Sequence, residues 1–181
     1  MKTESRMLTG IVGLFIAMPA FTQNGPASDE APSFVNEGTV NAAAPEVWKV
    51  WTSGEGYKAV GVALADVDFR IDGLIRSRYR ADGVLGDEET IENRIMAYEP
   101  QRMIAIRIER PPRSFPFHEA WKHTWTVVTL SDAGNGRTHI RVASMGFGTD
   151  PESLQMKQFF IRGNQDTLET LARHFQSGSR K

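Results

Sequence analysis

The stretch VDFRIDGLIRSRYR, from Val67 to Arg80, limits the possible folds of this chain more than any other feature. Hydrophobic and charged residues alternate along it, and the alternation breaks at Asp72 and Gly73. Because successive side chains of a strand point to opposite faces of a sheet, the pattern predicts a β-hairpin with one apolar face and one charged face. The apolar face needs a cover, so the chain must supply further elements that pack against it.

A three-residue loop, Ile71–Gly73, is predicted to close this hairpin, with Gly73 in the left-handed conformation. The expected opposite pairs are Phe69 with Ile75, Val67 with Ser77, Asp68 with Arg76, and Asp66 with Arg78. The arginines then have acidic partners on the neighbouring strand, and each exposed pair contributes about 0.2–1 kcal/mol at most. The chain carries 21 Lys+Arg and 22 Asp+Glu, so it lacks the net positive charge that is typical of nucleic-acid binding.

Strand patterns occur twice more along the chain. In ETIENRIMAYEPQRMIAIRIER, a turn over Tyr98–Gln101 is predicted to join two strands. The expected opposite pairs are Ile95 with Ile104, Asn93 with Ile106, Ile91 with Ile108, and Glu92 with Arg107. WKHTWTVVTLSDAGNGRTHIRVASMGF is predicted to form a further hairpin about Gly134–Gly136. Its first strand has apolar residues on both faces, and two inward-facing sets stay open: Trp121 and Trp125, or Thr124, Thr126 and Val128.

Two segments have helical periodicity, and Phe34–Asn41 precedes them as a short extended segment. Pro45 suits the first turn of a short amphipathic helix that ends at Thr52–Gly54. Asp150 is predicted to cap a long C-terminal helix that starts at Pro151. The apolar stripe of this helix holds Phe160, Ile161, Asn164, Leu168, Leu171, Ala172 and Phe175. The order of elements predicts an α+β fold, in which the long helix covers a curved antiparallel sheet and leaves space between them.

The N-terminus is predicted to be separate from the fold. Lys2 and Arg6 precede the apolar run MLTGIVGLFIAMPAF, which is shorter than the ~20 residues that a membrane-spanning helix needs. It predicts an export signal and a secreted or periplasmic protein, with an uncleaved membrane anchor as the alternative. The expected organisation is a signal peptide at 1–22, a disordered linker at 23–33, one domain at 34–176 and a flexible tail at 177–181. The absence of cysteine excludes disulfides, thiolate metal sites and cysteine nucleophiles.

Four short motifs, in order, resemble one branch of the START/SRPBCC superfamily, that of polyketide cyclases and homologues of the heat shock protein 90 ATPase activator. AAPEVWKVWT resembles its Ala-Pro-x-x-Val-Trp segment, DFRIDG its Asp-x-Arg-x-Gly-Gly turn, AYEPQR its Pro-centred turn, and GNGRTHIRV its Gly-rich hairpin. The resemblance covers Val40 to Phe175. It implies the helix-grip fold (Bet v 1-like), with about six or seven strands wrapped around the C-terminal helix. It also implies a cavity for a small hydrophobic or amphipathic molecule.

Motifs for metal binding and for nucleophilic catalysis are weak or missing. HEAWKH contains His118, Glu119 and His123, but its histidines are five residues apart, whereas the helical zinc motif needs a spacing of four. The chain has no Gly-x-Ser-x-Gly elbow and no phosphate-binding glycine loop. Asp87, Glu88 and Glu89 are interpreted as a solvated acidic tip. No metal and no cofactor are therefore expected, and no catalytic residue is assigned.

Polar residues embedded in apolar faces are the better candidates for a functional site, because a buried polar group needs a partner. The leading hypothesis is a carrier or sensor that binds a small hydrophobic or amphipathic ligand, without nucleic acid and without stable membrane insertion after signal cleavage. The expected ligand-binding residues are Val67, Phe69, Ser77, Tyr79, Ile91, Asn93, Ile104, Phe117, Phe160, Asn164 and Leu168. One alternative is a cyclase or dehydratase that uses Tyr79, Asn93 or His118. Another is a protein-interaction module with Trp121 and Trp125 on its surface.

Overall fold

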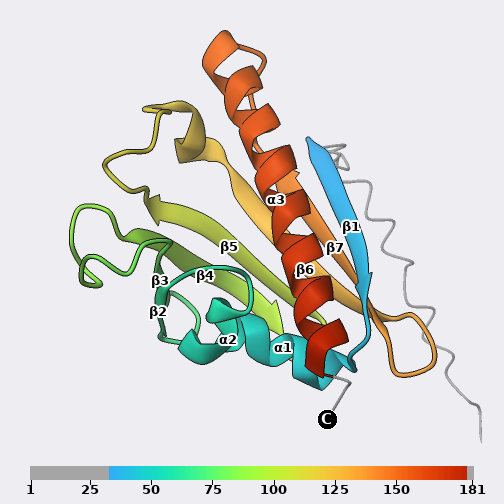
Figure 1. Ribbon diagram of the computed structural model, residues 1–181. Coiled ribbons are helices and arrows are strands. Elements are labelled where there is room, and N and C mark those ends of the chain that lie inside the picture. Colours follow the sequence, from blue (N-terminus) through green and yellow to red (C-terminus); the bar gives the residue numbers. More distant parts are fainter. Residues whose placement is uncertain (1–32, 179–181) are drawn as a thin grey trace, which may run out of the picture.

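The structure is a computed structural model that describes residues 33–178 (Figure 1). The predicted signal peptide, the predicted linker up to residue 32, and residues 179–181 of the predicted tail lie outside the described residues. Among the described residues, no helix combines the length and the apolarity that crossing a membrane requires. The C-terminal helix extends to Gly178, slightly beyond the predicted domain boundary at 176.

Seven strands form one antiparallel sheet in the order β1-β7-β6-β5-β4-β3-β2, so β2 to β7 are a meander and β1 pairs beside the last strand. The strands are β1 (Phe34–Val40), β2 (Leu64–Val67), β3 (Leu74–Arg78), β4 (Ile91–Glu99), β5 (Met103–Arg110), β6 (Trp125–Asp132) and β7 (Thr138–Met145). The helices are α1 (Ala44–Thr52), α2 (Gly54–Lys58), the 3-10 turn η1 (Ala120–His123) and α3 (Pro151–Gly178). α3 crosses one face of the sheet (Figure 1). The predicted α+β architecture, a sheet of six or seven strands with a long C-terminal helix, is confirmed.

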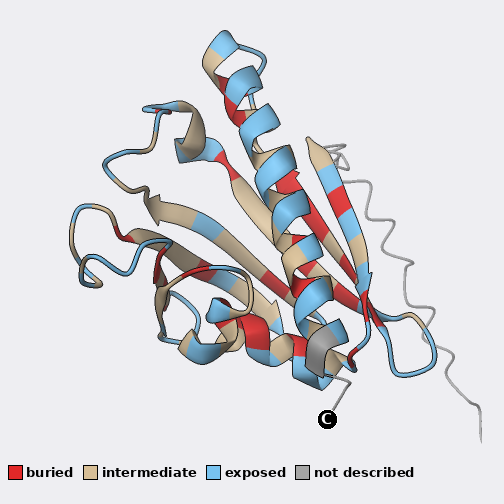
Figure 2. Cartoon of the chain, viewed as in Figure 1, coloured by how far each residue is buried: buried red, intermediate tan, exposed pale blue. Residues whose placement is uncertain are grey.

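The core lies between the inner face of the sheet and the helices. Fully buried isoleucines of four strands, Ile75, Ile95, Ile104 and Ile140, share this core with Leu168 and Leu171 of α3. Burial is concentrated on the sheet and on α1, whereas much of the outward side of α3 is exposed (Figure 2). The stripe that the sequence predicted for α3 therefore faces the core over its C-terminal half.

The first hairpin has the predicted faces but not the predicted register. Asp66 lies opposite Arg76 and Val67 opposite Ile75, so the strands are offset by two residues from the expected pairing and the connection spans 68–73. The cause is a competing partner, because this connection pairs with β4 rather than closing tightly on itself. The N–H of Asp72 donates to the carbonyl of Ile95 at 2.9 Å, and the N–H of Ile95 donates to the carbonyl of Gly73 at 2.9 Å.

The glycine in this connection has a different role from the predicted one. Asp72, with φ of 61°, is the residue in the left-handed conformation, which aspartate tolerates better than most residues. Gly73 is needed for close backbone approach, because a Cβ there would lie 1.9 Å from the carbonyl oxygen of Asp68. The predicted pairing of Asp68 with Arg76 is also wrong, since Asp68 contacts Arg70 at 2.9 Å.

The second hairpin is likewise shifted by two residues over part of its length. Asn93 lies opposite Ile108 and Ile95 opposite Ile106, and the register changes between Glu92 and Asn93 and between Ile95 and Ala97. Such bulges insert an extra residue into one strand, which a strictly alternating pattern does not reveal. The predicted partner of Glu92, Arg107, is therefore wrong.

The third hairpin forms as predicted, and the structure resolves which face of β6 points inward. Thr124 and Val128 are buried and Thr126 is half-buried, whereas Trp121 belongs to η1 rather than to a strand. The inward-facing residues of β6 are thus the even-numbered ones, and Trp125, the first residue of the strand, also borders the inner cavity. The short helix α2 was not predicted; it starts because the hydroxyl of Ser53 accepts a hydrogen bond from the N–H of Gly56 at 3.0 Å.

Two helical glycines are expected to respond to alanine with opposite signs. At Gly163 in α3 an added Cβ would meet nothing within 4 Å, so Gly163→Ala should raise the free energy of unfolding by about 0.5–1 kcal/mol. At Gly56 in α2 a Cβ would lie 2.1 Å from the carbonyl oxygen of Lys49, so Gly56→Ala should lower it. Urea unfolding of both variants measures the two changes. Equal effects would contradict the close approach of α1 and α2.

The outer face of the sheet carries an ionic network centred on Glu92, whose side chain is 16% exposed. It accepts hydrogen bonds from Arg76 at 3.3 Å and from Arg110 at 3.0 Å. The hydrogen bond from Arg110 lowers the pKa of Glu92 below its ordinary 4.5. The charge of Arg110 and the contact with Arg76 act in the same direction, and burial opposes them. The carboxylate therefore stabilises the fold above about pH 4.5, and this contribution is lost as the pH falls through the lowered pKa.

Glu92→Gln is expected to lower the free energy of unfolding by about 1–3 kcal/mol near neutral pH, because it removes a charged acceptor that has two arginine partners. The difference between the original protein and the variant should narrow as the pH falls below about 4.5. Urea unfolding of both proteins at a series of pH values measures this difference in the free energy of unfolding. Glu88→Gln is the control, because the Glu88 side chain is 73% exposed and its pair with Arg113 should contribute little. A difference that is independent of pH would contradict the role of the carboxylate.

Candidate functional site

The long helix covers only part of the inner face of the sheet, because it is anchored at one edge. Leu168 of α3 packs directly over Gly38 of β1, where a Cβ would lie 3.5 Å from that of Leu168. The side-chain amide of Asn36, also in β1, donates a hydrogen bond to the carbonyl of Ile161 in α3 at 3.1 Å. α3 is thus held over β1, and space remains between the helix and the strands β3 to β6.

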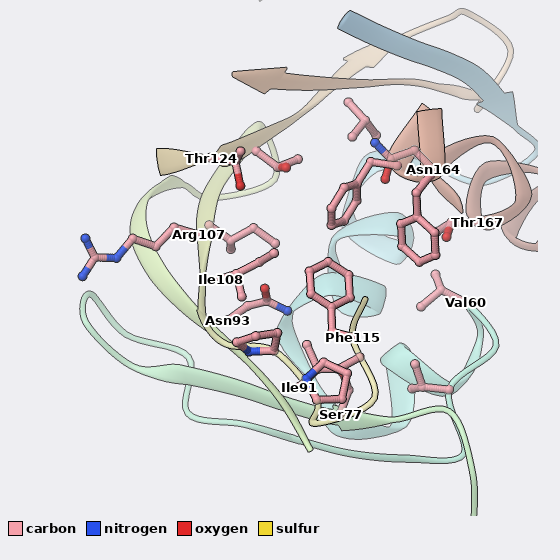
Figure 3. A pocket seen from close by; sticks show the side chains of 18 of the residues that line it. Val60, Ser77, Ile91, Asn93, Arg107, Ile108, Phe115, Thr124, Asn164 and Thr167 are labelled. Carbon is pink, nitrogen blue, oxygen red and sulfur yellow. The ribbon is translucent and has the colours of Figure 1, made fainter. Parts of the chain in front are cut away.

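A cavity of about 430 Å³ occupies this space (Figure 3). Its volume lies within the range of roughly 300–1,000 Å³ that is usual for small-molecule sites. The lining is mainly apolar and comes from β3 to β7, from the α1–α2 region, from α3 and from the Pro-rich loop 111–116. The interior between sheet and helix is therefore not filled by side chains.

Two polar side chains of neighbouring strands open on this apolar cavity without a partner. Ser77 of β3 lies opposite Ile91, and Asn93 of β4 lies opposite Ile75 and Ile108, so both are on the inner face. Asn93 projects inward near Ile91 and Ile108 (Figure 3). Neither the Ser77 hydroxyl nor the Asn93 amide forms a hydrogen bond to any residue in the part of the chain that the structure describes. Neither group is sealed in the core: Asn93 is half-buried and both line the cavity, where water or a ligand can serve as the partner.

Tyr57 is a third polar group of the lining, and the sequence analysis missed it. It lies in the unpredicted helix α2, is buried, and packs edge-on against Trp51 with 6.1 Å between ring centroids. Burial, with a smaller contribution from nearby Tyr79, raises the pKa of its hydroxyl, which therefore stays protonated at neutral pH. Within residues 33–178 this hydroxyl forms no hydrogen bond, and the buried indole N–H of Trp51 also has no partner.

At the helix end of the cavity the polar residues are partly paired. The amide of Asn164 in α3 lies 3.5 Å from the hydroxyl of Ser144 in β7, which is the long limit of a hydrogen bond. Thr126 and Thr167 also belong to the lining. The polar groups at this end therefore need a hydrogen-bond partner from a ligand less than Tyr57, Ser77 and Asn93 do.

Phenylalanines connect the Pro-rich loop to the helix beside the cavity. Phe115 of the loop contacts Phe117, Phe159 and Phe160, with ring centroids 5.2 to 6.2 Å apart. Phe160 in turn contacts Phe147 at 5.9 Å. Edge-to-face contacts of this kind fix the loop against α3 and form one wall of the cavity.

The charged residues at the cavity have acidic partners or point away. Arg107 is part of the lining, but its guanidinium points away from the interior (Figure 3) and lies 3.5 Å from Glu109. Arg78, a buried residue of the neighbouring strand end, contacts Asp87 at 2.5 Å. The described lining contains no carboxylate and no histidine. Likewise, no group of three or more potential metal ligands occurs among residues 33–178.

Of the eleven expected ligand-binding residues, the cavity brings six together: Ser77, Tyr79, Ile91, Asn93, Phe160 and Asn164. Tyr79 is at the rim, with 67% of its surface exposed. Five others lie off the lining. Ile104 and Leu168 belong to the buried core, Val67 and Phe69 pack against it, and Phe117 is buried against Phe115 and Phe159. Leu168 lies in the core because α3 is anchored over β1. Val67 and Phe69 are instead at the β2 edge of the sheet, where Phe69 packs against Trp48 and Tyr98.

The structure also shows where the residues lie on which the two alternative hypotheses depend. His118 is exposed and is not part of the lining. Trp121 is half-buried, and its indole N–H donates to the carbonyl of His118 at 3.1 Å. Trp125 is half-buried and lines the cavity, so the two indoles do not form a jointly exposed surface.

Comparison with known proteins identifies the fold. The sequence matches no protein-family model and no curated protein. Among solved structures, protein MLL2253 from Mesorhizobium loti is similar with a TM-score of 0.61 at 16% identity, over 80% of this chain and 96% of that one. The Aha1 dimer from Colwellia psychrerythraea is similar with a TM-score of 0.54 at 11% identity, over 77% of this chain and 95% of that one.

A third similar structure is the di-domain ARO/CYC BexL from the BE-7585A biosynthetic pathway. Its TM-score is 0.62 at 16% identity, over 82% of this chain and 47% of that one. Identities this low show the fold alone. They confirm the helix-grip fold that the resemblance of the sequence implied.

Proposed function

We propose that this helix-grip protein binds a small hydrophobic or amphipathic ligand in the cavity between β3–β6 and α3. One observation carries the proposal: a largely apolar cavity of about 430 Å³ contains polar side chains that have no partner among the described residues. Apolar surface in contact with water is unfavourable, and an amphipathic ligand removes it while it supplies a hydrogen-bond partner to the polar side chains. A carrier or sensor that is exported, as the N-terminal sequence predicts, is consistent with this role.

The chemistry of the lining favours binding over catalysis by proton transfer. A general acid or base works best with a pKa near the working pH, and the described lining offers tyrosines but no histidine or carboxylate. Burial raises the pKa of Tyr57 further from neutrality. The cyclase or dehydratase alternative therefore has no candidate base in the cavity, although BexL shares the fold.

The direct test is to identify what occupies the cavity. Protein purified under native conditions is extracted with organic solvent, and the extract is analysed by mass spectrometry. In parallel, the uncharged dye Nile red is bound to the protein and displaced with a panel of ketones, alcohols, alkanes and fatty acids. A co-purifying molecule, or displacement by members of the panel, supports the proposal. An empty extract together with no displacement would contradict it.

A further inference from the structure

The cavity has a polar end whose composition defines the chemistry of its ligand. Ser77 and Asn93 lie on adjacent strands, since Ser77 faces Ile91 and Asn93 is two residues further along β4, which makes the two side chains diagonal neighbours on one face. Ala65 of β2 lies opposite Ser77. A Cβ at Gly54 of α2 would lie 2.5 Å from the carbonyl oxygen of Ala65, so α2 packs on this edge of the sheet.

Tyr57 belongs to the same end of the cavity, because α2 positions it there. It is three residues after Gly54, which packs against Ala65 opposite Ser77, and it shares the cavity lining with Ser77, Tyr79 and Asn93. Tyr57 and Ser77 are both more than nine-tenths buried. Three groups that can each donate a hydrogen bond therefore line the cavity, two of them as diagonal neighbours on β3 and β4 and the third from α2.

The charge of the ligand follows from what this end lacks. A carboxylate or phosphate moved into a largely apolar cavity needs a cation or a metal to offset its lost hydration. Among the described residues of the lining, the one cationic side chain, Arg107, points out of the cavity (Figure 3). The nearby arginines are also engaged, because the buried Arg78 binds Asp87 and the exposed Arg80 binds Asp82.

We propose that the cavity selects an uncharged amphiphile with a carbonyl-type hydrogen-bond acceptor, whose polar end is bound by Tyr57, Ser77 and Asn93. The apolar part of this molecule lies toward Phe160 and the other phenylalanines of the loop and α3. Asn93 offers both a donor and an acceptor, so it also accommodates a hydroxyl next to the carbonyl. This inference rests on the proposed function and specifies the class of ligand for the same cavity.

The test uses three probes of equal chain length that differ only in the head group: decan-2-one, decanoate and decane. Each competes with Nile red on the full chain at a pH near 7.5, where decanoate is ionised. Tyr57→Phe removes only the hydroxyl, and Asn93→Leu replaces the amide with an apolar group of similar size. Each variant should lower the affinity for decan-2-one about tenfold, as expected for one lost hydrogen bond. The affinity for decane should change by less than about twofold. Decanoate should bind more weakly than decan-2-one.

A control variant and a stability measurement separate binding from folding. Tyr98→Phe is the matched control, because Tyr98 lies on β4 off the lining and packs against Phe69 at 4.6 Å between ring centroids. It should leave all three affinities unchanged. Since the Tyr57 hydroxyl has no partner among the described residues, Tyr57→Phe should not lower the thermal unfolding temperature. A marked decrease would assign the hydroxyl to the fold and overturn its role in recognition.

The outcomes distinguish this inference from the proposed function. Suppose that decane binds but the affinity for decan-2-one is unchanged in Tyr57→Phe and Asn93→Leu. The cavity then binds apolar molecules, and the assignment of its polar end is overturned. If decanoate binds as tightly as decan-2-one, the inference that the ligand is uncharged is overturned. If none of the three probes displaces Nile red, the proposed function fails and the inference fails with it.

Discussion

Leu171→Ala is expected to lower the free energy of unfolding by about 2–5 kcal/mol, as is typical when a buried leucine is truncated and leaves a void. Leu171 lies in α3, is completely buried and belongs to the core formed with the strands. The loss should be large because α3 is the only long helix of the described residues on this face of the sheet, and a close-packed core relaxes only partly into a void. Equilibrium unfolding in urea, followed by tryptophan fluorescence and by circular dichroism, measures the change.

Leu154→Ala is the matched control, because it is the same substitution in the same helix. Leu154 is 49% exposed, so its truncation should change the free energy of unfolding by less than about 0.5–1 kcal/mol. Equal losses at the two positions would contradict the orientation of α3 over the sheet. Coincident fluorescence and circular dichroism transitions are required for the comparison, since they establish two-state unfolding.

Thr126→Trp is expected to weaken ligand binding at least about 100-fold while the fold is retained. Thr126 lies on the inner face of β6, opposite Ile106 and Ser144, and its side chain lines the cavity. An indole at this position would exclude several methylene groups of a ligand, and each buried methylene contributes about 0.8 kcal/mol, so four of them account for a loss of this size. Nile red titration, followed by competition with decan-2-one, measures the affinity.

The control for this substitution is Thr129→Trp, on the same strand. Thr129 lies on the opposite face, between Met103 and Arg141 of the neighbouring strands, and does not line the cavity. Its replacement should leave the affinity for Nile red unchanged within about twofold. If Thr126→Trp bound the dye as tightly as the original protein, the ligand would not occupy the cavity, and the site would have to be sought elsewhere on the surface.

The sequence was sufficient to predict the order of elements and the two faces of each hairpin, because both follow from local periodicity. Register was not predictable in the same way. The first hairpin is shifted by two residues because Asp72 and Gly73 bond to Ile95 of β4, a partner more than twenty residues away in the sequence. The second is shifted by bulges, which depend on how the strand bends in the assembled sheet.

The candidate site was predictable in its polar residues but not in its boundaries. Ser77, Asn93 and Asn164 were recognised because a polar residue stood inside an apolar pattern, and the cavity brings all three together. Ile104 and Leu168 were expected to form walls, but the anchoring of α3 over β1 places them in the closed core. Tyr57 was missed because the short helix that carries it has no periodicity of its own and depends on the Ser53 cap.

The pairing of β1 with β7 has a consequence for the way the chain reaches its native state. Phe34 lies opposite Ser144, so the first strand waits for a partner that is synthesised after most of the domain. Contacts between such distant segments slow folding, because a large loop must close before the contact is gained. The meander from β2 to β6 can assemble from local hairpins, but β1 and α3 can join it only when nearly the whole chain is available. Folding is therefore completed late, when the two ends of the domain meet.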